Sequence, residues 1–242
     1  KLLPRRFYAR ETQASLPPPK SPTEAIASIR VKPGFQVELA AAEPLVEDPV
    51  AFDWGPDGAL WVVEMRDYPN GLNWNGPEDP KNRPGGRVKV LRDTNGDGRY
   101  DHAEIFLDRL PFPNGIKVWR GGVLITYAPR VVYAEDHDGD DRADELCTVL
   151  DGFVEGNQQH RMNGLRWGLD GWLYLANGDS GGRVRLLEHG LKAVQGLPRD
   201  KRLLEDSKWL EDARQVVSIN GRDLRFHPRT GHADAHHRLR AL

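Results

Sequence analysis

The residues best suited to chemistry gather in one segment, 155–182, where several polar side chains precede a strand–turn–strand pattern. These are Gln159, His160, Arg161 and Asn163, and the pattern ends at Asp179. Because a hairpin returns to its starting point, we expect His160 and Asp179 to lie together at one end. A carboxylate beside a histidine fixes its tautomer and raises its basicity, as a general base requires. The other three side chains would contact substrate or line a channel. The alternative is a hydrogen-bonded histidine that closes a turn.

The segment 93–104 has the spacing of a twelve-residue calcium loop. Oxygen ligands stand at loop positions 1, 3, 5, 9 and 12, and Gly98 occupies position 6, where the chain turns sharply. The candidate ligands are Asp93, Asn95, Asp97, Asp101 and Glu104. Strands rather than helices flank the segment, so it would be a calcium loop outside an EF-hand. The alternative is a solvated turn, in which Asp, Asn and Gly are favoured for local reasons.

A second acidic loop follows the same pattern less closely. Its candidate ligands are Asp136, Asp138, Asp140 and Asp144. Asp141 replaces the turn glycine, and Cys147 stands where the bidentate glutamate should be. In either loop we expect Ca²⁺ to clamp an outer loop, which is a structural role.

The chain reads as all-β, because short strand-like runs alternate with turn residues along most of its length. Similar hairpins recur at 52–63, 116–127 and 165–176, and similar acidic loops recur at 88–104 and 131–145. Two different elements that recur in one order favour a β-propeller over a β-sandwich. At ~40–50 residues per blade, residues 35–231 would hold about four blades.

The ends of the chain follow different patterns. Residues 1–20 are basic and proline-rich, which predicts a disordered leader or linker. A short helix should run from Ser21, its N-cap, to about Arg30, with Glu24 completing a capping box. We also expect a strand in 33–44, a helix in 198–214 and a partial propeller domain over 21–242. The tail 232–242 is rich in His and Arg and has no strand pattern.

Composition excludes several classes of protein. The net charge of -2 argues against a nucleic-acid-binding protein. No apolar run approaches the ~18 residues of a membrane-spanning helix. The single cysteine excludes an internal disulfide, a multi-cysteine metal site and a covalent haem motif. The recurring hairpin tryptophans Trp54, Trp119 and Trp167 are expected in the core.

Four segments carry a resemblance to a known family. They are 33–69, 85–101, 156–182 and 221–231. They resemble the propeller domain of the large membrane-bound dehydrogenases of planctomycete-type bacteria, which are related to soluble quinoprotein glucose and sorbosone dehydrogenases. The pattern of that wider group is matched by His160, Gly168, Asp170, Leu173, Tyr174, Gly178 and Asp179.

The resemblance implies a function and a location. His160 would take the hydroxyl proton of a sugar or alcohol while hydride passes to pyrroloquinoline quinone (PQQ), and Asp179 would orient His160. The cations that bind PQQ come largely from later blades in this family, so its ligands cannot be assigned here. The resemblance also implies a periplasmic or extracellular location, possible membrane association of the full-length protein, and a cytochrome-like haem domain further along the chain.

Three readings of the function remain open. The first is a fragment of a PQQ-type dehydrogenase, since the resembled propeller has six blades and this chain lacks an initiator methionine. The second is a non-catalytic, calcium-stabilised propeller that binds carbohydrate or protein, because one propeller fold hosts many functions. The third is an isolated chain without function, because an incomplete ring leaves open sheet edges.

Overall fold

The computed structural model describes residues 18–68, 84–178, 181–198 and 212–236, and it divides into two compact units, 1–42 and 43–242. In the first unit, α2 (Pro22–Ala27) begins with the predicted capping box. The side chain of Ser21 accepts a hydrogen bond from the backbone N–H of Glu24, and the Glu24 carboxylate accepts one from the backbone N–H of Ser21. The helix ends before the predicted Arg30. The predicted strand in 33–44 is wrong, since no part of this segment pairs with another strand and Phe35 is exposed. Most of the predicted leader lies outside the described residues.

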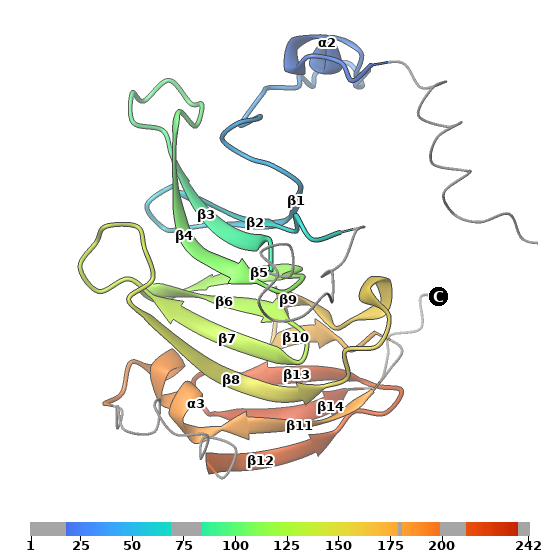
Figure 1. The fold of residues 1–242 in the computed structure, drawn as a ribbon, viewed down its shortest axis with the longest axis vertical. Coiled ribbons are helices and arrows are strands. Elements are labelled where there is room, and N and C mark those ends of the chain that lie inside the picture. Colours follow the sequence, from blue (N-terminus) through green and yellow to red (C-terminus); the bar gives the residue numbers. More distant parts are fainter. Residues whose placement is uncertain (1–17, 69–83, 179–180, 199–211, 237–242) are drawn as a thin grey trace, which may run out of the picture. The chain divides into compact units, whose positions relative to one another are not determined.

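The second unit contains three antiparallel sheets (Figure 1). The first sheet is a four-stranded meander in which each strand pairs with the next along the chain. Its strands are β1 (Pro49–Trp54), β2 (Leu60–Glu64), β3 (Gly86–Arg92) and β4 (His102–Leu110). A Pro-Asp-Gly turn at 56–58 joins β1 and β2, and the first acidic loop joins β3 and β4.

The second sheet begins as the same meander and is then extended. Its first four strands are β5 (Gly115–Trp119), β6 (Gly122–Tyr127), β7 (Arg130–Glu135) and β8 (Glu145–Phe153). The strands β11 (Gly182–Leu187) and β12 (Ala213–Ser218) add to its β8 edge, with α3 (Glu188–Gln195) between them in sequence. Residues 182–218 thus extend the second sheet instead of starting a new one.

The third sheet repeats the meander around this insertion. Its strands are β9 (Asn163–Trp167), β10 (Leu173–Ala176), β13 (Asp223–His227) and β14 (His232–His236). The expectation that the tail lacks a strand is therefore wrong for 232–236. Ala233 is buried and Ala235 packs against the core, so this segment alternates between small inward residues and polar outward ones.

The helix α3 was missed by the sequence analysis, and the predicted helix in 198–214 falls mostly outside the described residues. At its end, Ala213 and Arg214 belong to β12. Gly190 lies within α3 and lowers its helix propensity. A Cβ at this position would collide with the carbonyl oxygen of Thr148 on β8. Gly190 thus weakens the helical pattern in the sequence and also allows α3 to pack closely on the sheet.

The hydrophobic core lies between successive sheets. One buried cluster joins the first and second sheets, with Val63 and Val90 on one side and Ile125 on the other. A larger cluster joins the second and third sheets and includes Leu150 and Leu173. The first strands β1, β5 and β9 also lie beside one another. Consecutive meanders packed face to face are consistent with a β-propeller-like fold. We expected about four blades, whereas the described residues form three sheets.

Candidate functional site

His160 lies in a tight turn between the second and third sheets. It ends the 3₁₀ helix Gln158–His160, whose N-cap Asn157 accepts a hydrogen bond from the backbone N–H of Gln159. Arg161 closes the turn by donating its Nε–H to the carbonyl of Glu155, at 2.8 Å. These local bonds hold the backbone while the His160 side chain remains exposed.

The predicted site residues meet in one hollow of about 370 Å³. Its lining is formed by Gln159, His160, Arg161, Asn163, Ala176, Gly178 and Asp223. Four of the residues singled out by the sequence are therefore together. Asp179, the predicted partner of His160, lies outside the described residues, so the pairing of these two side chains stays a prediction.

Gly178 shows that the hairpin does return to His160. A Cβ on Gly178 would collide with the carbonyl oxygen of His160, and its φ of +78° is one that L side chains rarely adopt. Only glycine allows the two backbones to approach this closely. The chain is thus brought next to His160 one residue before Asp179.

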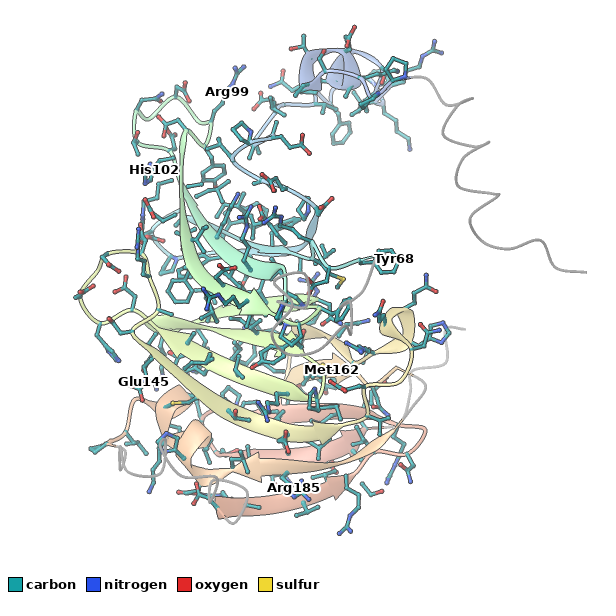
Figure 2. The ribbon with its side chains drawn as sticks, in the orientation of Figure 1. Tyr68, Arg99, His102, Glu145, Met162 and Arg185 are labelled. Atoms are coloured by element: carbon teal, nitrogen blue, oxygen red, sulfur yellow. The ribbon has the colours of Figure 1, made fainter. Side chains whose placement is uncertain are left out.

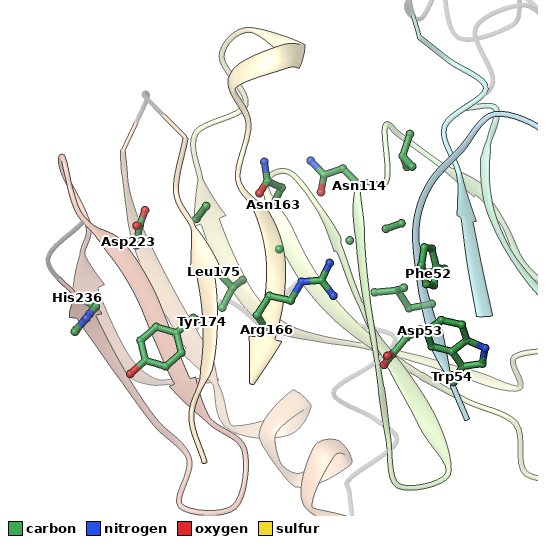
Figure 3. A pocket seen from close by; sticks show the side chains of 16 residues that line it. Phe52, Asp53, Trp54, Asn114, Asn163, Arg166, Tyr174, Leu175, Asp223 and His236 are labelled. Atoms are coloured by element: carbon green, nitrogen blue, oxygen red, sulfur yellow. The ribbon is translucent and has the colours of Figure 1, made fainter. Parts of the chain in front are cut away.

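A larger hollow of about 820 Å³ runs along the first strands of the three sheets (Figure 3). It shares Asn163, Ala176 and Asp223 with the hollow at His160, so the two are continuous. Phe52 and Trp54 line it from β1, and Arg166 extends from β9 toward β1. Trp54 is 57% exposed. The combined surface therefore offers aromatic faces, amides, carboxylates and a guanidinium.

A β-bulge places two of these polar groups on the same face of β9. Residues three apart on a regular strand point to opposite sides. The pairing of β9 with β10 shifts at Leu165, whose φ is +87° and whose side chain is buried. The extra residue re-aims the strand, and both Asn163 and Arg166 face the hollow. Among the described residues, neither side chain has a hydrogen-bond or ion-pair partner, so both are available to a ligand.

The carboxylates of the hollow are already engaged. Asp53 on β1 forms an ion pair with Lys117 on β5 at 2.8 Å and accepts the backbone N–H of Val118 at 2.7 Å. Asp223 accepts the backbone N–H of Asn177 at 3.0 Å. Asp53 therefore ties the first two sheets together, and Asp223 fixes the end of β10 beside the hollow.

Residues 21–239 match the family described as "Domain of unknown function (DUF7133)". The chain belongs to this family. No curated protein matches it. One similar solved structure is that of a proposed oxidoreductase (glucose dehydrogenase) from Thermus thermophilus, with 19% sequence identity and a TM-score of 0.41. The match covers 77% of this chain and 46% of that chain, so this chain spans about half of its length.

Part of the pattern that carries the family resemblance is structural in this DUF7133 domain. Asp170 accepts from the Tyr174 hydroxyl at 2.7 Å, a bond that lowers the pKa of Asp170, and it also accepts the backbone N–H of Trp172. A Cβ on Gly168 would overlap Asp170 and the Tyr174 ring. These residues shape the turn between β9 and β10. His160 and Gly178 lie at the other end of the hairpin.

The hairpin tryptophans are not all in the core of the DUF7133 domain. Trp119 is partly buried and stacks on Trp167 at 5.1 Å between ring centroids, whereas Trp167 is 39% exposed and Trp54 is exposed. The expectation is wrong for Trp54 and Trp167, which end β1 and β9 and stay exposed there, whereas Trp119 packs against the core cluster.

The first acidic loop of the DUF7133 domain is organised by hydrogen bonds to its own backbone. Asp93 accepts from the N–H groups of Gly96 and Gly98, while Asn95 and Asp97 each accept from the residue two positions ahead. Asp101 accepts from both the backbone and the side chain of Thr94, which lowers its pKa. Glu104 instead faces Arg142 at 3.3 Å. Among the described residues, no three acids of this loop converge as metal ligands.

The second acidic loop brings its carboxylates closer together. Oxygens of Asp136, Asp138 and Asp144 all lie within 4.8 Å of one another. The negative charges of Asp140 and Asp144 raise the pKa of Asp138, because each disfavours a further charge nearby. Three of the four predicted ligands are thus assembled here. The loop that matches the sequence pattern less closely has the more convergent acids.

Arg166, Asp223 and Phe52 were missed by the sequence analysis. The bulge that aims Arg166 into the hollow leaves no signal in the sequence. Asp223 is separated from His160 by the insertion 182–218. Phe52 could have been found, because it stands two residues before Trp54 on a strand and so shares its face. No helix among the described residues is long and apolar enough to span a membrane.

Proposed function

We propose that this chain forms one wall of a site that binds and oxidises a sugar or alcohol, with His160 as the general base. The observation that carries the proposal is the continuous surface from His160 through Asn163 to Arg166 and Trp54. Neutral amides and a guanidinium hydrogen-bond hydroxyl groups, while an exposed indole face packs against a sugar ring. The resemblance of the His160 segment to quinoprotein dehydrogenases supports the choice of reaction.

In this reaction, the neutral imidazole of His160 accepts the proton of a substrate hydroxyl. The C–H bond on the same carbon breaks, and its hydrogen leaves with both electrons as hydride for a two-electron acceptor. The alcohol becomes a carbonyl. Asn163 would orient the substrate hydroxyl groups, and Arg166 would stabilise the oxygen that gains negative charge. Asp179 remains the proposed orienting partner of His160.

PQQ is the acceptor that the resemblance proposes, but the described lining does not by itself fit this group. PQQ carries three carboxylates, and among the described residues that line the two hollows only Arg161 and Arg166 bear a permanent positive charge. The two carboxylates Asp53 and Asp223 oppose anion binding there. The lining fits the substrate better than the cofactor, so the cations for PQQ would come from beyond the described residues.

Further parts of the proposal rest on the same resemblance. They are an incomplete ring of the six-bladed type, a place in the planctomycete-type membrane-bound dehydrogenases, a periplasmic or extracellular location and an electron-accepting haem domain. We also propose that Ca²⁺ binds the acidic loops. The second loop is the stronger candidate in the structure, because hard oxygen ligands already converge there.

The second candidate function is carbohydrate binding without turnover. The exposed pair Phe52 and Trp54 favours it, since the two rings lie edge to face at 5.0 Å and form an apolar platform. A dye-linked assay with PQQ, Ca²⁺ and a panel of sugars and alcohols separates the two functions, together with calorimetric titration of the same compounds. Turnover that is lost in His160→Ala supports oxidation. Binding without turnover in the presence of acceptor supports the binding module.

A further inference from the structure

A buried group of three different metal-binding side chains lies away from the hollow, between β8 and α3. It consists of Cys147, His189 and Glu145. Cys147 and His189 are 1% and 6% exposed. Glu145 and Cys147 are alternate residues of β8 and so project to the same side of the sheet. His189 is the second residue of α3, which packs on β8 (Figure 1); Figure 2 labels Glu145 at the start of this strand.

The distances between the donor atoms match a tetrahedral metal centre. Sγ of Cys147 lies 3.5 Å from Nε2 of His189 and 3.4 Å from Oε1 of Glu145, and all three donors lie within 4.8 Å of one another. Zinc bonds of about 2.3 Å to sulfur and 2.0–2.1 Å to nitrogen place neighbouring ligand atoms of a tetrahedron roughly 3.5–3.6 Å apart. One ion could therefore bind all three atoms with little movement.

Neighbouring residues hold two of these ligands in place. Nε2 of His137 lies 3.2 Å from Oε2 of Glu145, which leaves Oε1 directed at Cys147. The backbone N–H of His189 donates to Asp212 at 2.7 Å, and this bond anchors the first turn of α3. Such outer contacts orient metal ligands in known sites.

We propose that Cys147, His189 and Glu145 bind a divalent transition-metal ion, with zinc as the preferred metal. Sulfur and imidazole ligands suit Zn²⁺ and exclude Ca²⁺, which takes oxygen ligands. Binding forms a metal–sulfur bond and releases the thiol proton of Cys147. In zinc sites with three protein ligands, water takes the fourth position. The ion would join the inserted α3 to β8, so it would stabilise the extended second sheet. The proposal is independent of the proposed oxidation.

Cobalt titration of the tag-free chain after chelator treatment tests this proposal. Cys147 is the single cysteine, so a thiolate-to-cobalt charge-transfer band can come only from it. We expect this band, with the intense visible bands of tetrahedral Co²⁺, to saturate at one ion per chain and to disappear when Zn²⁺ is added. A folded chain that binds Co²⁺ without the thiolate band, or binds none, overturns the site.

Variants and a second measurement complete the test. Cys147→Ser should abolish the band, and His189→Gln should weaken cobalt binding by at least about tenfold, since a direct ligand is lost. His227→Gln on β13 is the matched control and should leave the titration unchanged. If His189→Gln shows the thiolate-to-cobalt band and binds Co²⁺ as tightly as the wild type, His189 is not a ligand and the proposed ligand set is wrong. If Cys147→Ser does not fold, the reaction of the wild-type thiol with Ellman's reagent decides: Zn²⁺ should slow it many-fold, and an unchanged rate contradicts the proposal.

Discussion

Gly178 packs against the backbone of His160 so closely that no side chain fits between them. This contact joins the end of β10 to the turn that carries the proposed base. The relationship explains why glycine stands at position 178, directly after β10. Asp179 is the next residue along the chain.

Gly178→Ala should destabilise the domain and disturb the His160 turn. The substitution adds a side chain at a φ of +78°, which costs about 1–2 kcal/mol, and it adds a collision with a carbonyl oxygen. Gly58→Ala is the matched control, because its φ is +83° and the space around it is open. Denaturant unfolding should show a larger loss for Gly178→Ala than for Gly58→Ala. Equal losses would mean that the contact with His160 is unimportant.

Arg166→Gln should weaken the binding of sugars or alcohols without changing stability. The guanidinium faces the hollow and has no partner among the described residues, so its removal leaves no group unpaired. A lost hydrogen bond to a charged group predicts roughly tenfold weaker binding in calorimetric titration. Arg99→Gln, in the first acidic loop, should bind as the wild type does. A melting temperature that falls with Arg166→Gln would indicate a structural role instead.

Glu64→Gln should lower stability strongly. Glu64 is fully buried on β2, where it pairs with Arg87 and with Lys89 at 3.0 Å and accepts the backbone N–H of Glu47 at 2.7 Å. Removing its charge leaves two cations without their buried anion, which costs about 3 kcal/mol or more. Glu104→Gln weakens only the contacts with the exposed side chains of Arg142 and His102 and should cost less than about 1 kcal/mol. Similar losses of unfolding free energy in chemical denaturation would contradict the conclusion that burial makes the Glu64 ion pairs the more important ones.

Ca²⁺ should raise the melting temperature through the second acidic loop, and Asp138→Asn should reduce this rise. Asp140 and Asp144 raise the pKa of Asp138, so the folded state holds its proton more tightly than the unfolded state. Without Ca²⁺, the contribution of Asp138 to stability should therefore fall as the pH rises through the normal range of a carboxyl group. Bound Ca²⁺ should remove this loss. Asp97→Asn tests the first loop; if it alone abolishes the rise, the first loop is the site.

The sequence predicted the fold best where local chemistry decides the structure. The Gly and Asp residues of the hairpin turns and the capping box at Ser21 were found because each acts through its near neighbours. The predicted strand in 33–44 failed because a strand needs a partner that the residues themselves do not specify. The helix at Gly190 and the strand at Ala233 were missed because packing against other elements overrides their weak local preferences.

The candidate site was predicted in part for the same reason. Gln159, His160, Arg161 and Asn163 are close in sequence, so one turn and one strand end bring them together. Asp223 comes from β13, beyond a long insertion, and only the sheet pairing reveals it. The direction of Arg166 depends on a bulge at a buried leucine. Contacts of this kind depend on the assembled third sheet.

The most direct measurement of the central claim is the rate of dye-linked alcohol or sugar oxidation by the His160→Ala variant. If His160 is the base, kcat should fall by about 10²–10⁴-fold while the affinity for the substrate changes only slightly. His137→Ala, in the second acidic loop, should leave the rate unchanged. A His160→Ala variant that oxidises the substrate at the wild-type rate would contradict the assignment of the base.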